Sequence, residues 1–334
     1  MYIDPLIPDR RAVPLKATLL RHPHGISAVD TLYVRPGHAA AHIIVDGGRA
    51  AFVDVGTNDS VPQLLAALAE LGIERSAVDY LLLTHVHLDH AGGAGQLLTH
   101  LPNALALVHP RGAAHLADPA RLIAGSIAVY GEARFRELYG TLVPIPHARL
   151  RSAADGERVQ LGGRTLELIH TPGHALHHLA VVDAAHGALF SGDTFGISYR
   201  ELDTPCGAFI IPTTTPTQFD PQQHLASVDR MLSYHPQSIY LMHFSRVSEV
   251  PRLGAELKEQ ITALTHIAHS HARSADPAAG IRADMRALWL RRLRAHGSRL
   301  SEAAIDAALA GDLELNTQGL IAYLARASAR EQRP

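Results

Sequence analysis

Three histidines and one aspartate occupy six consecutive positions that begin at His85, one residue after the apolar run 80–83. The apolar run predicts a buried strand, so these polar side chains are expected on the loop that leaves its carboxyl end. Imidazole and carboxylate are ligand types that zinc, iron and manganese accept. His85 and His87 can point the same way, while Asp89 and His90 turn toward a second centre. The spacing therefore predicts a metal-binding loop, in preference to a surface loop that merely holds histidines.

Four more potential ligands occupy the same kind of position, each just after a predicted strand: Asp54, His174, Asp193 and His243. His174 ends the turn Thr171-Pro172-Gly173-His174, which presents its side chain at the tip. Taken singly, each of these residues is more typical of a turn or of a satisfied core position. Their shared layout favours one site over four unrelated turns.

Apolar runs and turn residues alternate along most of the chain in a pattern typical of mixed α/β proteins. Asp46-Gly47-Gly48 predicts a hairpin turn, and Gly92-Gly93 predicts a tight turn ahead of a helix. Strands are predicted at 41–45, 50–53, 79–83, 105–108, 158–161, 165–169, 179–182, 188–190 and 238–242, and helices at 61–71, 93–101, 110–139 and 221–235. From Pro251 onward the spacing is helical, with breaks near Asp276-Pro277 and Gly297.

This order gives two β-rich halves with helices outside them, which predicts two sheets packed face to face between helical layers. The predicted fold class is therefore α/β, a four-layer αββα sandwich of two mixed β-sheets with a C-terminal helical extension. We expect the sandwich domain over residues 1–250 and the extension over residues 251–334. The extension either caps the site or forms the interface of an oligomer, such as a homodimer.

The composition is that of an ordinary soluble globular protein and argues against several partners. Hydrophobic residues make up 47% and charged residues 19% of the chain, and the formal net charge is −2. Without a basic stripe, nucleic acid is not an expected partner. No apolar run reaches the roughly 18 residues of a membrane span, so no membrane association is expected. The single cysteine, Cys206, allows no intramolecular disulfide, and residues 1–5 show no signal-peptide pattern, so we expect a cytoplasmic protein.

Taken together, these motifs resemble the metallo-β-lactamase superfamily over residues 28–250. That family carries a strand-end Asp, the motif H-x-H-x-D-H, a His in a T-P-G-H turn, an Asp in a G-D pair and a final His. The matching positions in this chain are Asp54, His85, His87, Asp89, His90, His174, Asp193 and His243, in that order. The resemblance implies the αββα fold and two divalent metal ions, zinc first, with iron or manganese as alternatives.

The resemblance also implies a role for each matching residue. One metal ion is implied on His85, His87 and His174, and a second on Asp89, His90 and His243, with Asp193 bridging both. Asp54 is implied to hydrogen-bond the histidine loop and not to bind metal, a role worth about 10- to 100-fold in affinity or activity at other sites. His178 occupies a position where related hydrolases carry a second histidine after the ligand, and we expect it to support the ligands.

The chemistry implied by such a centre is hydrolysis without a covalent intermediate. Two metal ions about 3.5–4 Å apart share a water and lower its pKa toward about 7, so that a bridging hydroxide attacks an ester, thioester or lactone carbonyl. Asp89 is expected to orient this nucleophile or to carry a proton to the leaving group. Lactonases of the superfamily place a tyrosine near the metals after the bridging Asp. Tyr199, in the long irregular segment 194–216, is the matching catalytic candidate.

Within the superfamily, the residues favour the glyoxalase II and lactonase branch. Asp193 stands where the zinc β-lactamases generally carry a cysteine ligand, which disfavours β-lactam hydrolysis. The C-terminal tail shows no recognisable basic set for binding glutathione, which weakens a strict glyoxalase II assignment. Two alternatives remain open. One is a diiron protein that handles redox chemistry or oxygen on the same ligands, and the other is a non-catalytic binding protein that has kept the site.

Overall fold

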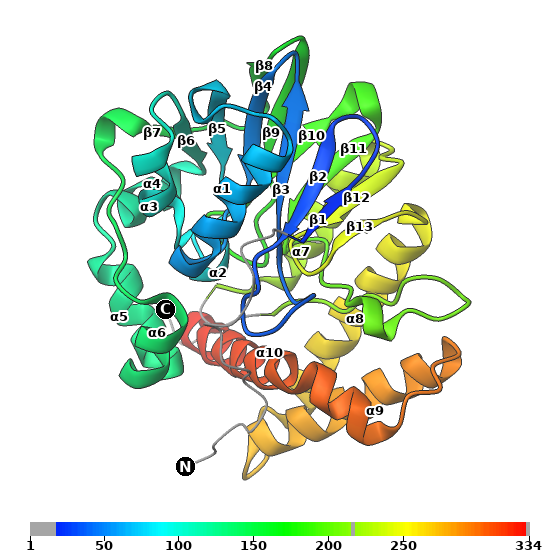
Figure 1. Cartoon of the computed structure of the whole chain (residues 1–334). Coiled ribbons are helices and arrows are strands. Elements are labelled where there is room, and N and C mark those ends of the chain that lie inside the picture. The colour runs from blue at the N-terminus through cyan, green and yellow to red at the C-terminus, as the bar shows by residue number, and fades with distance from the viewer. Residues whose placement is uncertain (1–17, 215–217, 332–334) are drawn as a thin grey trace. The chain divides into compact units, whose positions relative to one another are not determined.

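The structure, a computed structural model, describes residues 18–214 and 218–331. Contacts between residues divide the chain after Leu168 into two units, and each unit has a hydrophobic core of its own. The division falls inside strand β9 (Arg164–His170), which starts in the first unit and ends in the second (Figure 1). Each unit carries part of the predicted ligand set.

The first unit is built on a seven-stranded mixed sheet whose strands follow one another in chain order. These strands are β1 (Leu19–Arg21), β2 (Ile26–Asp30), β3 (Ala40–Asp46), β4 (Arg49–Val53), β5 (Val78–Leu82), β6 (Leu105–Val108) and β7 (Leu150–Ser152). Strands β1 to β4 pair antiparallel, and β4 to β7 pair parallel. Because parallel strands end at the same edge of a sheet, Asp54 after β4 and Thr84 after β5 leave that edge as neighbours.

Helices connect the parallel strands of this sheet, as crossover connections require. They are α1 (Val61–Glu70), α2 (Leu88–Ala91), α3 (Ala94–His100), α4 (Pro110–Ala117), α5 (Ala120–Tyr130) and α6 (Glu132–Tyr139). Helix α1 has Pro62 in its first turn, where the missing N–H has no partner to lose, and it buries Leu64 and Leu68 against the sheet. The helices predicted in this half are confirmed, with α2 as an addition.

The turn between β3 and β4 has the conformation that its sequence predicts. Gly47 and Gly48 have φ values of 55° and 77°, the left-handed pair that a two-residue type I′ turn needs and that glycine adopts without strain. Asp46 accepts the N–H of Gly163 at 2.8 Å. This bond ties the hairpin of β8 (Glu157–Leu161) and β9 to the first sheet.

The second sheet has six strands in the order β13-β12-β11-β10-β9-β8. Its strands in the second unit are β10 (Leu179–Asp183), β11 (Ala188–Gly192), β12 (Ser238–Leu241) and β13 (Ser245–Val247). Strands β11 and β12 pair parallel, and helix α7 (Pro221–Ser233) lies between them in the chain. Asp193 after β11 and His243 after β12 therefore leave the same edge of the sheet, as Asp54 and Thr84 do in the first sheet.

Three long helices complete the second unit: α8 (Val250–His271), α9 (Pro277–Ala295) and α10 (Glu302–Glu331). The breaks lie where the sequence predicts them, because Asp276 caps α9 and Gly297 follows its end with a φ of 90°. Figure 1 shows α9 and α10 side by side, and Trp289 and Leu320 from these helices join the core of the second unit. The domain boundary at residue 250 stays a prediction. No helix within residues 18–214 and 218–331 has the length and apolar character needed to cross a membrane.

Three short strands have no clear signal in the sequence. Strands β1, β7 and β13 contain three residues each, too few for an alternation of apolar and polar side chains to be recognised. All three lie at the edge of a sheet. Their conformation is therefore decided by pairing with the neighbouring strand and not by their own residues.

The buried histidine of the first sheet, His42 on β3, makes stability depend on pH. Its side chain is 2% exposed, and burial, with a smaller effect of the His22 charge, lowers the pKa of His42 to about 3 from 6.5. The unfolded chain binds this proton below pH 6.5 and the folded chain does not, so stability falls as the pH drops from 6.5 toward 3.

We expect His42→Leu to reduce by one the number of protons that the chain takes up when it unfolds between pH 6.5 and pH 3. At pH 5 the histidine should cost the wild type about 2 kcal/mol of unfolding free energy relative to pH 7, and the variant should not show this loss. Denaturant unfolding at both pH values measures the difference. The exposed His147→Gln serves as the control and should keep the wild-type dependence, and equal slopes for wild type and His42→Leu would contradict the assignment.

Candidate metal centre

Asp54 is the buried carboxylate around which the predicted ligands of the first unit are arranged. It accepts the Thr84 N–H at 2.8 Å, the Thr84 hydroxyl at 2.7 Å and Nδ1–H of His90 at 2.8 Å. Its φ of 56° lies in the left-handed region that residues other than glycine rarely adopt. Such strain persists where surrounding contacts enforce it, and it gathers at functional sites. Asp54 therefore ties the end of β4 to the loop after β5.

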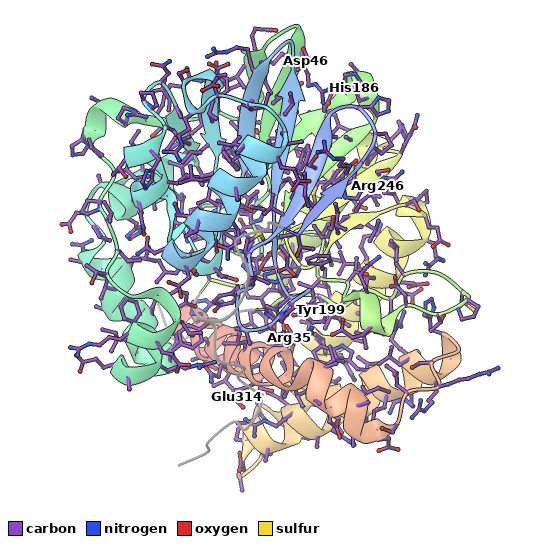
Figure 2. The ribbon with its side chains drawn as sticks, in the orientation of Figure 1. Arg35, Asp46, His186, Tyr199, Arg246 and Glu314 are labelled. Atoms are coloured by element: carbon purple, nitrogen blue, oxygen red, sulfur yellow. The ribbon has the colours of Figure 1, made fainter. Side chains whose placement is uncertain are left out.

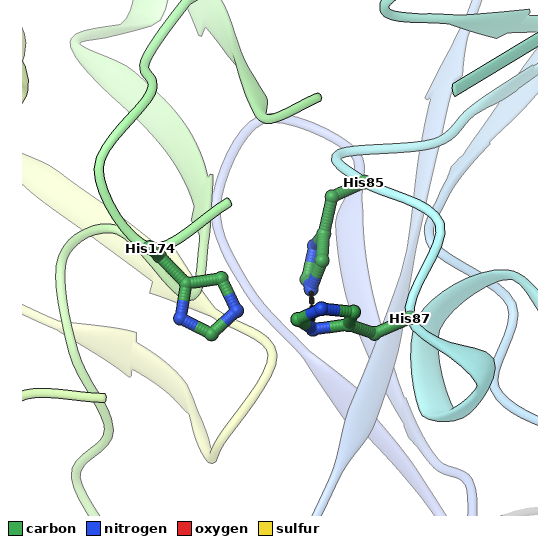
Figure 3. A group of neighbouring side chains, drawn as sticks. All are labelled: His85, His87 and His174. Carbon is green, nitrogen blue, oxygen red and sulfur yellow. Dashed lines mark hydrogen bonds between the residues drawn. The ribbon is translucent and has the colours of Figure 1, made fainter. Parts of the chain in front are cut away.

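These hydrogen bonds decide which ring nitrogen of each histidine carries the proton. A carboxylate only accepts, so His90 donates from Nδ1 and its lone pair lies on Nε2. The one hydroxyl proton of Thr84 goes to Asp54, so the Thr84 oxygen accepts from Nδ1 of His85 at 3.1 Å. The lone pair of His85 then also lies on Nε2, which faces Nδ1 of His87 at 2.8 Å (Figure 3). Holding one ring nitrogen in this way is how proteins orient a metal-binding histidine.

The chain after His87 forms the short helix α2, whereas the sequence predicts a loop. Helix α2 starts with His87 as its N-cap and places Asp89 and His90 on consecutive helical positions. A single turn of four residues is too short to give a periodic signal. Oδ2 of Asp89 lies 3.8 Å from Nε2 of His90, and the Asp89 side chain is 20% exposed. The first unit thus presents two pairs of predicted ligands, His85 with His87 and Asp89 with His90.

The two glycines after α2 are needed for space and not for a left-handed turn. Gly92 and Gly93 have ordinary φ values of −61° and −83°. A Cβ atom on Gly93 would lie 2.4 Å from the carbonyl oxygen of Thr57. Close packing against the chain after β4 therefore explains this glycine, and the expected tight turn uses backbone that any residue can adopt.

In the second unit one carboxylate faces two histidines. Oδ2 of Asp193 lies 3.6 Å from Nε2 of His174, and Oδ1 lies 3.8 Å from Nε2 of His243. The parallel pairing of β11 with β12 brings Asp193 and His243 together, and all three side chains are at most 7% exposed. A carboxylate that directs one oxygen at each of two ligands has the arrangement that a bridging ligand needs.

His178 holds the backbone of Asp193. The Asp193 N–H donates to Nε2 of His178 at 3.2 Å, so Nδ1 carries the proton and donates to the Thr171 hydroxyl at 2.8 Å. Protein groups engage both ring nitrogens, which suits a residue that supports the ligands and does not bind metal itself.

The turn that presents His174 requires its glycine. Gly173 has a φ of 137°, and a Cβ atom there would lie 2.2 Å from Cα of His224 on α7. His224, which the sequence did not single out, is fully buried and donates from Nε2 to the carbonyl oxygen of Thr194 at 2.7 Å. Burial lowers the pKa of His224 to about 4, against the effects of that hydrogen bond and of the Asp193 charge. A neutral histidine therefore links α7 to the chain beside Asp193.

Tyr199 lies in the core of the second unit (Figure 2). Its side chain is 1% exposed, and its hydroxyl donates to Oδ1 of Asp312 on α10 at 3.2 Å. The segment that carries it is described over residues 194–214, and positions 215 and 216 of the predicted segment lie outside the described residues. The catalytic role of Tyr199 stays a prediction.

Three tyrosines of the first unit form a cluster that the sequence did not indicate. The hydroxyls of Tyr33 and Tyr139 are 2.7 Å apart, and the rings of Tyr130 and Tyr139 meet edge to face. Burial raises the pKa of Tyr130 to about 12 and those of Tyr33 and Tyr139 above their ordinary value, with the Asp89 charge adding in each case. The cluster thus supplies neutral hydroxyls in the electrostatic field of a predicted ligand. No local pattern joins Tyr33 to Tyr139, because 106 positions separate them.

The donors of both units suit a metal ion. They are imidazole nitrogens and carboxylate oxygens, the set that zinc, iron and manganese share. The described part of the chain therefore contains histidine and aspartate groups that could bind a metal. The hydrogen bonds from Nδ1 of His85 and His90 leave the lone pair of each ring on Nε2, a position from which imidazole can bind a metal.

Comparison with known proteins agrees with these features. The sequence profile of the metallo-beta-lactamase superfamily matches residues 34–243. A metallo-beta-lactamase fold-containing protein of Sulfurisphaera tokodaii is 27% identical over 68% of this chain and 79% of its own length. The hydroxyacylglutathione hydrolase of Aeromonas hydrophila is 31% identical over 57% of this chain and 55% of its own length. The chain thus spans about half the length of that hydrolase.

Solved structures share the fold. The crystal structure of the archaeal superfamily protein from Sulfolobus tokodaii superposes with a TM-score of 0.59 and 25% identity, over 72% of this chain and 86% of the other. A metallo-beta-lactamase family protein of Thermus thermophilus superposes with a TM-score of 0.61 and 20% identity, over 94% and 93%. The predicted fold class, two mixed sheets with flanking helices and C-terminal helices, is confirmed. The superfamily profile covers more than half of the length of this chain. The chain therefore belongs to the metallo-beta-lactamase superfamily.

Proposed function

We propose that this protein is a dinuclear metal-dependent hydrolase that acts on an ester, thioester or lactone. The proposed ligands are His85, His87, Asp89, His90, His174, Asp193 and His243, which all lie within the matched region. Membership of a superfamily that consists mostly of hydrolases supports the reaction type. Relatives named hydroxyacylglutathione hydrolase, 31% and 32% identical, support a thioester or a similar carbonyl substrate.

The arrangement of Asp193 carries the dinuclear part of the proposal. A carboxylate that bound a single metal ion would face the other ligands of that one ion only. Asp193 instead directs Oδ2 toward His174 and Oδ1 toward His243. The hydrogen bond from the Asp193 N–H to His178 fixes the backbone from which this carboxylate extends.

Bound divalent metal ions would supply Lewis acidity and an acidified water at neutral pH. The protein's own contribution is to hold His85, His90 and His174 with the lone pair on Nε2 and to move a proton. Among three carboxylates, Asp89 is 20% exposed, Asp193 7% and Asp54 3%. Asp89 is therefore the carboxylate best placed to exchange a proton with solvent, and we assign to it the proton that the leaving group takes up.

The substrate is proposed only as a chemical class. The chain covers about half of the hydroxyacylglutathione hydrolases it matches, and its C-terminal tail shows no recognisable basic set for glutathione. A diiron protein on the same ligands is the second candidate, because imidazole and carboxylate also suit iron.

We expect purified protein loaded with zinc to hydrolyse at least one member of a panel of thioesters, aryl esters and lactones. Metal analysis should give two ions per chain, and a chelator should abolish turnover. Absence of hydrolysis on the whole panel with both ions bound would overturn the proposal. An absorption band of oxo-bridged iron in the protein as isolated, together with oxygen consumption, would support the diiron candidate.

Asp54→Asn should weaken metal binding about 10- to 100-fold without removing any ligand. The amide keeps the size of the side chain, but it cannot accept from the Thr84 N–H, the Thr84 hydroxyl and His90 through two carboxylate oxygens. Zinc affinity measured by competition with a chromophoric chelator tests this. Asp79→Asn, which changes a surface carboxylate paired with Arg49, is the matched control.

Tyr199→Phe tests the proposed catalytic tyrosine. We expect a lower kcat with the metal content unchanged, because the substitution removes only the hydroxyl. The measurements are steady-state kinetics and metal analysis on the same preparation. An unchanged kcat with a lower thermal midpoint would restrict the hydroxyl to its bond with Asp312 and take Tyr199 out of the mechanism.

A further inference from the structure

We propose that the C-terminal helix α10 positions the metal ligand His174, acting through Asn316, Thr214 and Thr213. The inference rests on the proposed metal centre and adds to it a residue set outside the ligands. Thr213, Thr214 and Asn316 are 5%, 0% and 2% exposed. A buried polar side chain lowers the stability of the fold unless its hydrogen bonds are made. The hydrogen bonds among these three residues and His174 therefore contribute to stability only as a complete set.

The contact of Thr213 with His174 decides the state of the ligand. Nδ1 of His174 lies 2.6 Å from the Thr213 hydroxyl and 3.4 Å from the Thr213 carbonyl oxygen. A carbonyl oxygen only accepts, so Nδ1 carries the proton. The lone pair of His174 is then on Nε2, the atom that lies 3.6 Å from Oδ2 of Asp193.

The same hydroxyl also holds the proposed bridging residue. Thr213 donates its single hydroxyl proton to the carbonyl oxygen of Asp193 at 3.2 Å. Its oxygen can therefore serve His174 only as an acceptor, which agrees with the proton on Nδ1. One threonine thus fixes the ring of one ligand and the backbone of another, so a displacement of Thr213 would misplace both.

Asn316 of α10 holds the residue next to Thr213. Its Oδ1 accepts the Thr214 N–H, and the Thr214 hydroxyl bonds Oδ1 at 2.7 Å and the Asn316 carbonyl oxygen at 3.0 Å. Its Nδ2 donates to the carbonyl oxygen of Asp312 at 2.8 Å. The Asp312 contact fixes the amide orientation, because only the amide nitrogen donates to a carbonyl. Asn316 therefore holds Thr214 by backbone and side chain together.

Comparison with the first unit explains why an anchor on α10 is needed. Thr84 contacts His85 from the adjacent position in the chain, so the peptide bond already keeps the two residues close together. Thr213 lies 39 positions from His174, at the end of the irregular segment 194–214. Such a segment places a side chain only as well as its contacts hold it. Asn316 supplies that hold, so α10 is part of the ligand scaffold.

The test compares zinc affinity in three variants and a control. Thr213→Val keeps the shape and removes the hydroxyl, Thr213→Ser restores the hydroxyl, and Asn316→Ala removes the anchor. Glu314→Gln is the control on the same helix (Figure 2), since Glu314 pairs with Arg282 of α9. We expect about 10- to 100-fold weaker zinc binding for Thr213→Val and Asn316→Ala, and wild-type affinity for Thr213→Ser and Glu314→Gln.

Two further readouts separate positioning from general loss of structure. The visible spectrum of the cobalt-loaded protein should change in Thr213→Val and Asn316→Ala, because the geometry around His174 changes. Since coupling between binding sites and structure is reciprocal, zinc should increase amide hydrogen-exchange protection in α10 of the wild type and less so in Asn316→Ala.

The outcomes distinguish a failure of the proposed metal-dependent function from a failure of the positioning role of α10. If the wild-type protein itself does not bind zinc, cobalt, iron or manganese, the proposed function fails. If the wild type binds zinc and Thr213→Val binds it equally tightly with an unchanged cobalt spectrum, the positioning role is wrong and the metal centre stands. If Asn316→Ala does not fold, the Val and Ser pair at Thr213 and the wild-type exchange experiment still decide the point.

Discussion

The proposed ligands of the first unit depend on one buried carboxylate in an unfavourable backbone conformation. Asp54 accepts three hydrogen bonds from Thr84 and His90, and its backbone has a φ of 56°. Each bond opposes relaxation of the backbone, and the backbone keeps the acceptor where the donors need it. A buried donor that loses its acceptor costs about 1–3 kcal/mol of stability. The left-handed backbone of Asp54 and its three hydrogen bonds therefore depend on one another. The strained strand end is thus inseparable from the proton positions on His85 and His90.

Both units select a histidine tautomer by the same device. A neutral imidazole can carry its proton on either nitrogen, and only the other nitrogen can bind a metal. Thr84 gives its proton to Asp54 and accepts from His85, and Thr213 gives its proton to the Asp193 carbonyl and accepts from His174. In each case an acceptor that cannot donate fixes the direction of the hydroxyl. Threonine suits this task because it has one proton to give and lone pairs to accept with.

Local signals could predict most of the strands, the main helices and the positions of the predicted ligands at strand ends. Asp54, Asp193 and His243 each follow an apolar run, and that pattern is contained within a few residues. The contacts that orient the ligands are different. Nothing near Thr213 points to His174, and nothing near Tyr33 points to Tyr139, because the fold alone brings such residues together. The helix α2 and the three-residue edge strands escaped prediction because they are shorter than any recognisable period.

Environment, and not residue type, distinguishes the three aspartates of the proposed centre. Asp54 is 3% exposed and accepts three hydrogen bonds that hold the loop. Asp193 is 7% exposed and has both oxygens directed at histidines. Asp89 has 20% exposure and tyrosine hydroxyls in its field. A group that relays protons must reach solvent and must survive a change of charge. Of the three, Asp89 is the most exposed to solvent, which is why we propose it for the proton transfer.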